Sequence, residues 1–174
     1  MNQERENTRG AIQDDELDDD DDDYNQENQF LTFKVASEIY GIEILSISEI
    51  IRLIGITPIP ETMEFVKGII NLRGKIILVM DIRLRFGLPE REYDDRTCII
   101  VVNIDGLEIG LIVDFVSEVV EIEEDQIEQM PSRGGGERQR FIRAVGKVGG
   151  EVKILLDLNK LLFDEELEKI KNMT

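Results

Sequence analysis

The sequence FVKGIINLRGKIILVMD, residues 65–81, contains two apolar runs separated by Arg73-Gly74-Lys75. A glycine in such a short connection allows the backbone angles of a tight turn, so the stretch predicts a β-hairpin. Asp81 follows the second run and is expected to cap a helical turn over 82–86, which Gly87 and Pro89 would end. The stretch therefore predicts a strand, a turn, a strand and a short helix.

The same pattern recurs later in the chain. A shift of 76 positions overlays 65–86 on 141–162 without a gap, and a shift of 69 positions overlays 30–51 on 99–120. We interpret this register as an internal repeat, although a shared period of two is common to all hairpins and is the alternative explanation. The matched residues are Phe65 with Phe141, Gly74 with Gly150, Asp81 with Asp157, Gly41 with Gly110, and Ser48-Glu49 with Ser117-Glu118.

Alternating apolar and polar residues, or apolar runs next to glycines, predict the remaining strands. The apolar spacing in 45–54 is close to helical and predicts a short helix or bend. The polar, glycine-rich stretch 123–140 is expected to be a loop, and 164–171 a C-terminal helix. The other predicted strands cover 30–35, 40–44, 98–102, 107–113, 141–148 and 152–156.

Several short strands at close spacing in each half, of about 65 residues, favour two small β-barrels. We therefore expect a mainly β fold with short helices. Its subdomains would cover about 29–88 and 97–163, with some exchange of elements between them, and 164–174 would form a C-terminal helix and tail. Each barrel alone buries little surface, so the two are expected to pack together and leave a groove for a partner.

The chain carries a net charge of −18, and residues 1–28 account for −10 of it. Like charges at this density repel, and little apolar surface is present to offset chain entropy, so 1–28 is expected to be a disordered acidic tail. A weak contact of this tail with a cation or a partner is the alternative. The acidic balance argues against nucleic-acid binding and against an anionic membrane surface.

Residues that would support catalysis are scarce. The chain has no histidine, which removes the commonest general base and metal ligand. Its single cysteine, Cys98, begins an apolar strand, and no phosphate-binding loop motif is present. We expect no enzyme activity, no cofactor and no metal. The absence of cysteine pairs and of an apolar leader or spanning segment fits a cytoplasmic protein.

The motif G-x-x-N-L-R-G at 68–74, followed by an apolar strand, Asp81 and a short basic helix ending in Phe86-Gly87, resembles the signature of CheW-like domains. The resemblance covers about 29–163. Further similar segments are Tyr40-Gly41-Ile42, Ile47-Ser48-Glu49-Ile50, and Val113-Asp114 with Val116-Ser117-Glu118.

This resemblance implies two SH3-like five-stranded barrels and a non-enzymatic scaffold. Such proteins couple methyl-accepting chemoreceptors to the chemotaxis histidine kinase CheA. They bind the regulatory domain of the kinase and the cytoplasmic tips of the receptors, in arrays at the inner membrane but without membrane insertion. The alternatives are an adaptor of a different kinase pathway and a small acidic barrel that binds or hydrolyses a ligand.

The resemblance also implies site residues. Ile47, Glu49, Gly68 and Arg73 match positions linked to receptor or kinase binding, and Arg140 and Phe141 resemble a patch facing the kinase. Each has a structural alternative. Ile47 and Phe141 would also suit the core, Glu49 has a repeat counterpart, Gly68 would allow close backbone approach, and Arg73 would suit an exposed turn. The basic residues Arg133, Arg138, Arg140 and Arg143 would either meet an acidic partner or be solvated.

Overall fold

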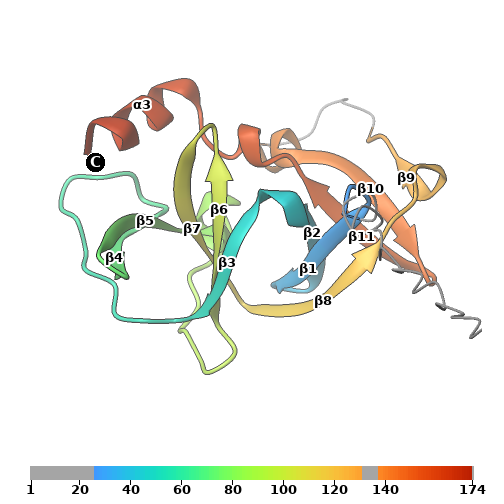
Figure 1. The fold of residues 1–174 in the computed structure, drawn as a ribbon, viewed down its shortest axis with the longest axis horizontal. Helices are drawn as coiled ribbons and strands as arrows, with labels where there is room; N and C mark the ends of the chain where they lie inside the picture. The colour runs from blue at the N-terminus through green and yellow to red at the C-terminus, as the bar shows by residue number, and fades with distance from the viewer. Residues whose placement is uncertain (1–25, 131–136, 174) are drawn as a thin grey trace, which may run out of the picture.

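The computed structural model describes residues 26–130 and 137–173, which form two β-sheets with short helices (Figure 1). This confirms the mainly β fold class. Most of the predicted acidic tail, residues 1–25, and the glycines at 134–136 lie outside the described residues. In the described part of the chain, no helix is long and apolar enough to cross a membrane.

Each sheet contains strands from both halves of the sequence. Sheet A has the order β8 (Phe115–Glu121), β1 (Gln29–Val35), β2 (Glu38–Glu43), β11 (Glu151–Leu156), β10 (Ile142–Val148), β9 (Ile127–Glu128). Sheet B has the order β3 (Ile47–Arg52), β6 (Cys98–Ile104), β7 (Leu107–Val113), β5 (Lys75–Asp81), β4 (Val66–Leu72). The helical elements are η1 (Ile44–Ser46), α2 (Ile82–Arg85), η2 (Glu124–Gln126), η3 (Glu137–Phe141), η4 (Leu158–Lys160) and α3 (Asp164–Met173).

The strand order confirms the internal repeat. Under the two sequence shifts, β8-β1-β2-β11-β10 corresponds strand for strand to β3-β6-β7-β5-β4. The third strand of each repeat crosses to the other sheet: β3 pairs with β6, and β8 pairs with β1. The chain therefore crosses from sheet A to sheet B before β3 and returns to sheet A before β8, so each sheet combines the first two strands of one repeat with the last three of the other.

Local irregularities are repeated as well. The pairing of β3 with β6 skips Ser48, and the equivalent pairing of β8 with β1 shifts between Val116 and Val119. Asp81 and Asp157 both act as N-caps, accepting hydrogen bonds from the backbone two residues later, 2.8 and 3.1 Å away. An alternation of apolar and polar residues that is common to all hairpins does not place bulges and caps at equivalent positions. These features therefore favour a true repeat.

The sheets do not close into the expected barrels. Within residues 26–130 and 137–173, no ladder joins the terminal strands β3 and β4 of sheet B, or β8 and β9 of sheet A. In sheet B, the segment after β3 reaches β4 through a pair of hydrogen bonds between Thr57 and Ile69, both 2.9 Å. This contact brings the two edges of sheet B together locally.

Two segments differ from the sequence-based expectation. The prediction of a short helix or bend over 45–54 is wrong for most of its length, because β3 occupies residues 47–52. Ile50 and Ile54 are exposed, and these outward apolar residues disturb the alternation typical of a strand. The predicted loop over 123–140 contains η2, β9 and part of η3. The C-terminal helix is confirmed as α3.

One apolar core joins the two sheets. A run of aromatic rings crosses it, with centroid distances of 6.0 Å (Phe33 to Tyr40), 5.2 Å (Tyr40 to Phe86) and 5.7 Å (Phe86 to Phe141). Helix α3 lies over sheet B in Figure 1 and buries Ile170 in the same core. The shared core fixes the sheets relative to each other and holds the surface loops in place.

Candidate docking surface

An ion pair between Arg73 and Glu49 joins the tip of the β4–β5 hairpin to β3. Nη1 of Arg73 donates to Oε1 of Glu49 over 2.9 Å, and Nη2 donates to Oε2. The turn is stabilised by the Gly74 amide, which donates to Oδ1 of Asn71 over 2.8 Å. The Arg73 side chain remains 72% exposed, so this cation is presented to solvent in a fixed orientation.

A second ion pair lies on the same sheet. The ammonium of Lys75 contacts Oε2 of Glu108. The hydrogen bond from Arg73 lowers the pKa of the Glu49 carboxyl, and the hydrogen bond from Lys75 lowers the pKa of the Glu108 carboxyl. Both carboxylates are therefore ionised at neutral pH, and they hold two cations near the hairpin tip.

Exposed apolar side chains accompany these charges. Ile50 and Ile76 are 44% and 49% exposed, next in sequence to Glu49 and Lys75. Their repeat counterparts in sheet A, Val119 and Val152, are 51% and 55% exposed. Large apolar side chains beside oriented charges are typical of surfaces that bind other proteins.

The other two predicted binding residues have structural roles. Ile47 is half-buried and packs against the central core. Gly68 has a φ of +148°, and a Cβ atom at this position would overlap the carbonyl group of Thr57. Glycine is needed here because the Thr57–Ile69 contact brings two backbones together. The structure thus brings Glu49 and Arg73 into contact, while Ile47 and Gly68 support the surrounding fold.

The second predicted patch is divided between surface and core. The guanidinium of Arg140 stacks over the ring of Phe163, with 3.1 Å between its central carbon and the ring centroid. Phe141 is only 2% exposed and belongs to the core. Arg138 and Arg143 pair with Glu38 and Glu43 on β2, and Arg133 lies outside the described residues.

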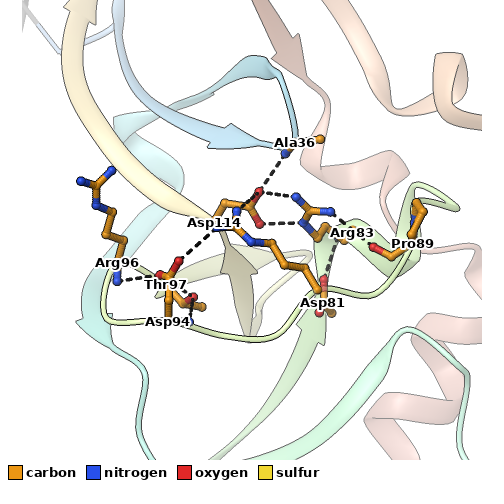
Figure 2. Close-up of polar contacts among 9 residues, drawn as sticks. Ala36, Asp81, Arg83, Pro89, Asp94, Arg96, Thr97 and Asp114 are labelled. Carbon is orange, nitrogen blue, oxygen red and sulfur yellow. Dashed lines mark hydrogen bonds and ion pairs between the residues drawn. The ribbon is translucent and has the colours of Figure 1, made fainter.

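A polar network that the residue patterns did not predict lies where the chain crosses from sheet B to sheet A (Figure 2). Asp114 is at the crossover between β7 and β8. Nε and Nη2 of Arg83 donate to its two carboxylate oxygens over 2.8 and 2.7 Å, and the amide of Ala36 donates to Oδ2 over 2.8 Å. We call these two side chains the Arg83–Asp114 clasp. It ties α2 of sheet B to the β1–β2 turn of sheet A.

The surroundings of the clasp shift the pKa values of its carboxylate and of a neighbouring tyrosine. Burial alone would raise the pKa of Asp114, but hydrogen bonds from Arg83 and the Ala36 amide, with the nearby charge of Arg91, hold the pKa below its usual range. Beside it, burial and a 2.7 Å hydrogen bond to Asp81 raise the pKa of Tyr93. The Val113-Asp114 step and the short basic helix were visible in the sequence, but their contact was not.

Among residues 26–130 and 137–173, no three or more Asp, Glu or Cys side chains are grouped so that they could hold a metal ion. The charged side chains described above form ion pairs instead. This arrangement suits recognition of another protein.

Comparison with known proteins agrees with the geometry. The family model of the CheW-like domain matches residues 29–166. The chain belongs to the CheW-like domain family. The match covers both sheets and reaches into α3, so the family model includes the whole two-sheet architecture.

Two relatives and one solved structure show how closely the CheW-like family resembles this chain. The chain is 35% identical to the chemotaxis protein CheW of Klebsiella aerogenes, covering 83% of this chain and 87% of the relative. It is 30% identical to the chemotaxis protein CheW of Treponema pallidum, covering 86% and 90%. The crystal structure of the scaffolding protein TtCheW from Thermoanaerobacter tengcongensis matches with a TM-score of 0.74 and 38% identity, covering 80% of this chain and 95% of that one.

Proposed function

We propose that the chain is a non-enzymatic cytoplasmic adaptor that couples methyl-accepting chemoreceptors to the histidine kinase CheA in arrays at the inner membrane. Membership of the CheW-like family supports this proposal, since relatives are named chemotaxis proteins and a similar structure is titled a scaffolding protein. The observation that carries it is the exposed Glu49–Arg73 pair at the β4–β5 tip.

In this proposal the charged hairpin tip contacts the receptor tip or the regulatory domain of the kinase. Arg73 supplies an oriented cation, and the adjoining Ile50 and Ile76 supply apolar area. Ile47 and Gly68 act by holding β3 and β4 in position. Arg140, stacked on Phe163, is a second candidate contact for the kinase, and Phe141 supports it from the core.

Reconstitution tests the proposal. The chain is mixed with a chemotaxis kinase and receptor signalling fragments, and co-elution and kinase autophosphorylation are measured. We expect the Arg73→Asp variant to weaken ternary-complex formation by about tenfold or more, because it replaces the exposed cation with an anion. Lys147→Asp is the matched control. It reverses another exposed cation, which pairs with Glu128 on β9, and should behave as wild type.

A charge exchange separates partner binding from internal support. The double variant Glu49→Arg with Arg73→Glu restores an ion pair but reverses its orientation. If Arg73 contacts a partner, the exchange stays defective. Recovery of wild-type coupling by the exchange would show that the pair only stabilises the hairpin. Failure of the wild-type chain to bind either partner would overturn the adaptor assignment itself.

A further inference from the structure

A polar hollow lies at the ends of β2 and β11 in sheet A, and the equivalent ends of β7 and β5 in sheet B carry the Arg83–Asp114 clasp. Its volume is about 260 Å³. Its polar lining consists of Glu43, Ser46, Asn103, Arg143, Asp157 and Asn159.

The repeat register identifies what is missing from the hollow. Asp157 corresponds to Asp81, and Asn159 corresponds to Arg83. The exposed Leu45, in η1 beside the hollow residue Ser46, takes the position of Asp114. The frame around the clasp is thus repeated, but both members of the ion pair are replaced by uncharged residues. The shorter Asn159 leaves open the space that the guanidinium of Arg83 occupies in the other repeat.

The lining favours a cation that can donate several hydrogen bonds. The hollow has two carboxylates, Glu43 and Asp157, against one cation, Arg143, which already pairs with Glu43. Oδ1 of Asp157 accepts the Asn159 amide over 3.1 Å, while Oδ2 lies 4.0 Å from the ammonium of Lys160, at the limit of an ion pair. In the other repeat, the equivalent oxygen of Asp81 accepts a 2.7 Å hydrogen bond from Tyr93.

We propose that this hollow binds an arginine side chain of a partner protein, whose guanidinium takes the place that Arg83 occupies in the other repeat. A guanidinium is favoured over an ammonium because it is planar and presents five donors in a fixed geometry. It would donate to Oδ2 of Asp157, which has only the 4.0 Å contact with the Lys160 ammonium, and to the side-chain oxygens around it. The inference goes beyond the adaptor role, since it holds for any protein that presents such an arginine.

The test is an amide chemical-shift titration of the full-length chain. The probe is arginine blocked at both ends (N-acetyl-arginine N-methylamide), and blocked citrulline is the neutral isostere. We expect saturable shifts at Ser46, Asn103 and Asn159 with arginine, and at least about fivefold weaker binding of citrulline.

Two variants of the chain complete the test. Asp157→Asn keeps an N-cap residue but removes the charge, and should weaken arginine binding by about fivefold or more. Asn159→Arg supplies the missing guanidinium from the chain itself and should abolish binding. Glu124→Gln removes an exposed carboxylate in η2 and is the control that should bind as wild type.

Three outcomes overturn the inference. The first is the absence of saturable shifts around the hollow in the wild-type chain. The second is an equal response to citrulline and arginine, which would exclude recognition of the cation. The third is equal loss of binding in Glu124→Gln and Asp157→Asn, which would indicate general attraction to an acidic surface. The spectra report folding directly, and if one variant unfolds, the other variant and the isostere still decide the result.

Discussion

Replacing Asp114 by Asn tests whether the Arg83–Asp114 clasp holds the two sheets together. The amide has the same shape as the carboxylate and can still accept hydrogen bonds from the Ala36 amide and from one N–H of Arg83. It loses the negative charge and the charge-assisted hydrogen bond from Nε of Arg83 to Oδ1, which now measures 2.8 Å. Arg83 would then be a cation with a side chain only 14% exposed and with no anion in bidentate contact.

The geometry sets the size of the effect. Removing one partner of a buried ion pair typically costs about 3–5 kcal/mol. Arg83 keeps its 3.3 Å hydrogen bond to the Pro89 carbonyl and the nearby charge of Asp81, which offset part of this loss. We therefore expect the free energy of unfolding to fall by about 2–3 kcal/mol. For a chain of this length, Tm should fall by roughly 4–12 °C.

Urea unfolding at neutral pH measures this change. The matched control is Glu128→Gln, which removes the anion from the pair with Lys147, where both side chains are 59% exposed. Exposed pairs contribute about 0–1 kcal/mol, so the control should be close to wild type. An Asp114→Asn cost below ~1 kcal/mol, or equal to that of the control, would refute the clasp as a major tie between the sheets.

The pH dependence gives a second check on Asp114. Its pKa is lower in the folded chain than in the unfolded chain, so the native state holds the carboxylate deprotonated more strongly. The stabilisation is fully present above the unfolded pKa of about 3.9 and is lost as pH falls through the folded pKa. The stability difference between wild type and Asp114→Asn should therefore shrink below about pH 4. A difference that grows in acid would contradict this assignment.

Four further substitutions test local features. Gly68→Ala should lower the free energy of unfolding by at least ~3 kcal/mol, because the added Cβ overlaps backbone atoms of Thr57. Gly74→Ala should lower it by about 1 kcal/mol, because the position has a positive φ but faces open space. Thermal unfolding of the two variants compares these effects. Thr32→Val should cost about 1–3 kcal/mol by urea unfolding, since the buried hydroxyl donates to the Glu118 carbonyl over 2.8 Å and accepts from its amide over 3.2 Å. Ile170→Ala should weaken the docking of α3 by about 2–4 kcal/mol, seen as loss of hydrogen-exchange protection in α3 while β6 stays protected.

Much of the fold could be predicted because the internal repeat identifies strands that are ambiguous when one short stretch of sequence is considered alone. Overlaying 65–86 on 141–162 located β4, β5, β10 and β11, and it placed Asp81 and Asp157 at equivalent caps. Overlaying 30–51 on 99–120 located β1, β2, β6 and β7. These strands have buried, regularly alternating or continuous apolar residues, which is the pattern that sequence reasoning detects best.

The strands β3 and β8 were harder to predict, for a physical reason. β3 and β8 are terminal strands with exposed apolar residues, Ile50 and Val119, and each contains a bulge that shifts the alternation. The period of such a strand no longer distinguishes it from a helix. Outward apolar residues that confuse the prediction are also the ones available to a partner.

The contacts of the candidate site could be predicted only in part. The exposed turn at Arg73 follows from its local sequence, but its bidentate pairing with Glu49 depends on the approach of β3 and β4, the terminal strands of sheet B. Likewise, the Arg83–Asp114 clasp joins residues 31 positions apart, on elements whose approach is set by the crossover between the sheets. Local patterns carry no information about such an approach.

The two repeats share a framework but differ where they meet other groups. Around sheet B the chain has Arg73 at the β4–β5 tip and the Arg83–Asp114 clasp, whereas the equivalent positions around sheet A are Gly149, Asn159 and Leu45. Arg83 and Asp114 thus neutralise each other at the end of sheet B, where Arg73 is also presented as an oriented cation, while the equivalent end of sheet A has an open polar hollow. Because the chain crosses between the sheets before β3 and again before β8, each sheet needs strands of both repeats, so neither the Arg73 surface nor the hollow forms unless both repeats fold.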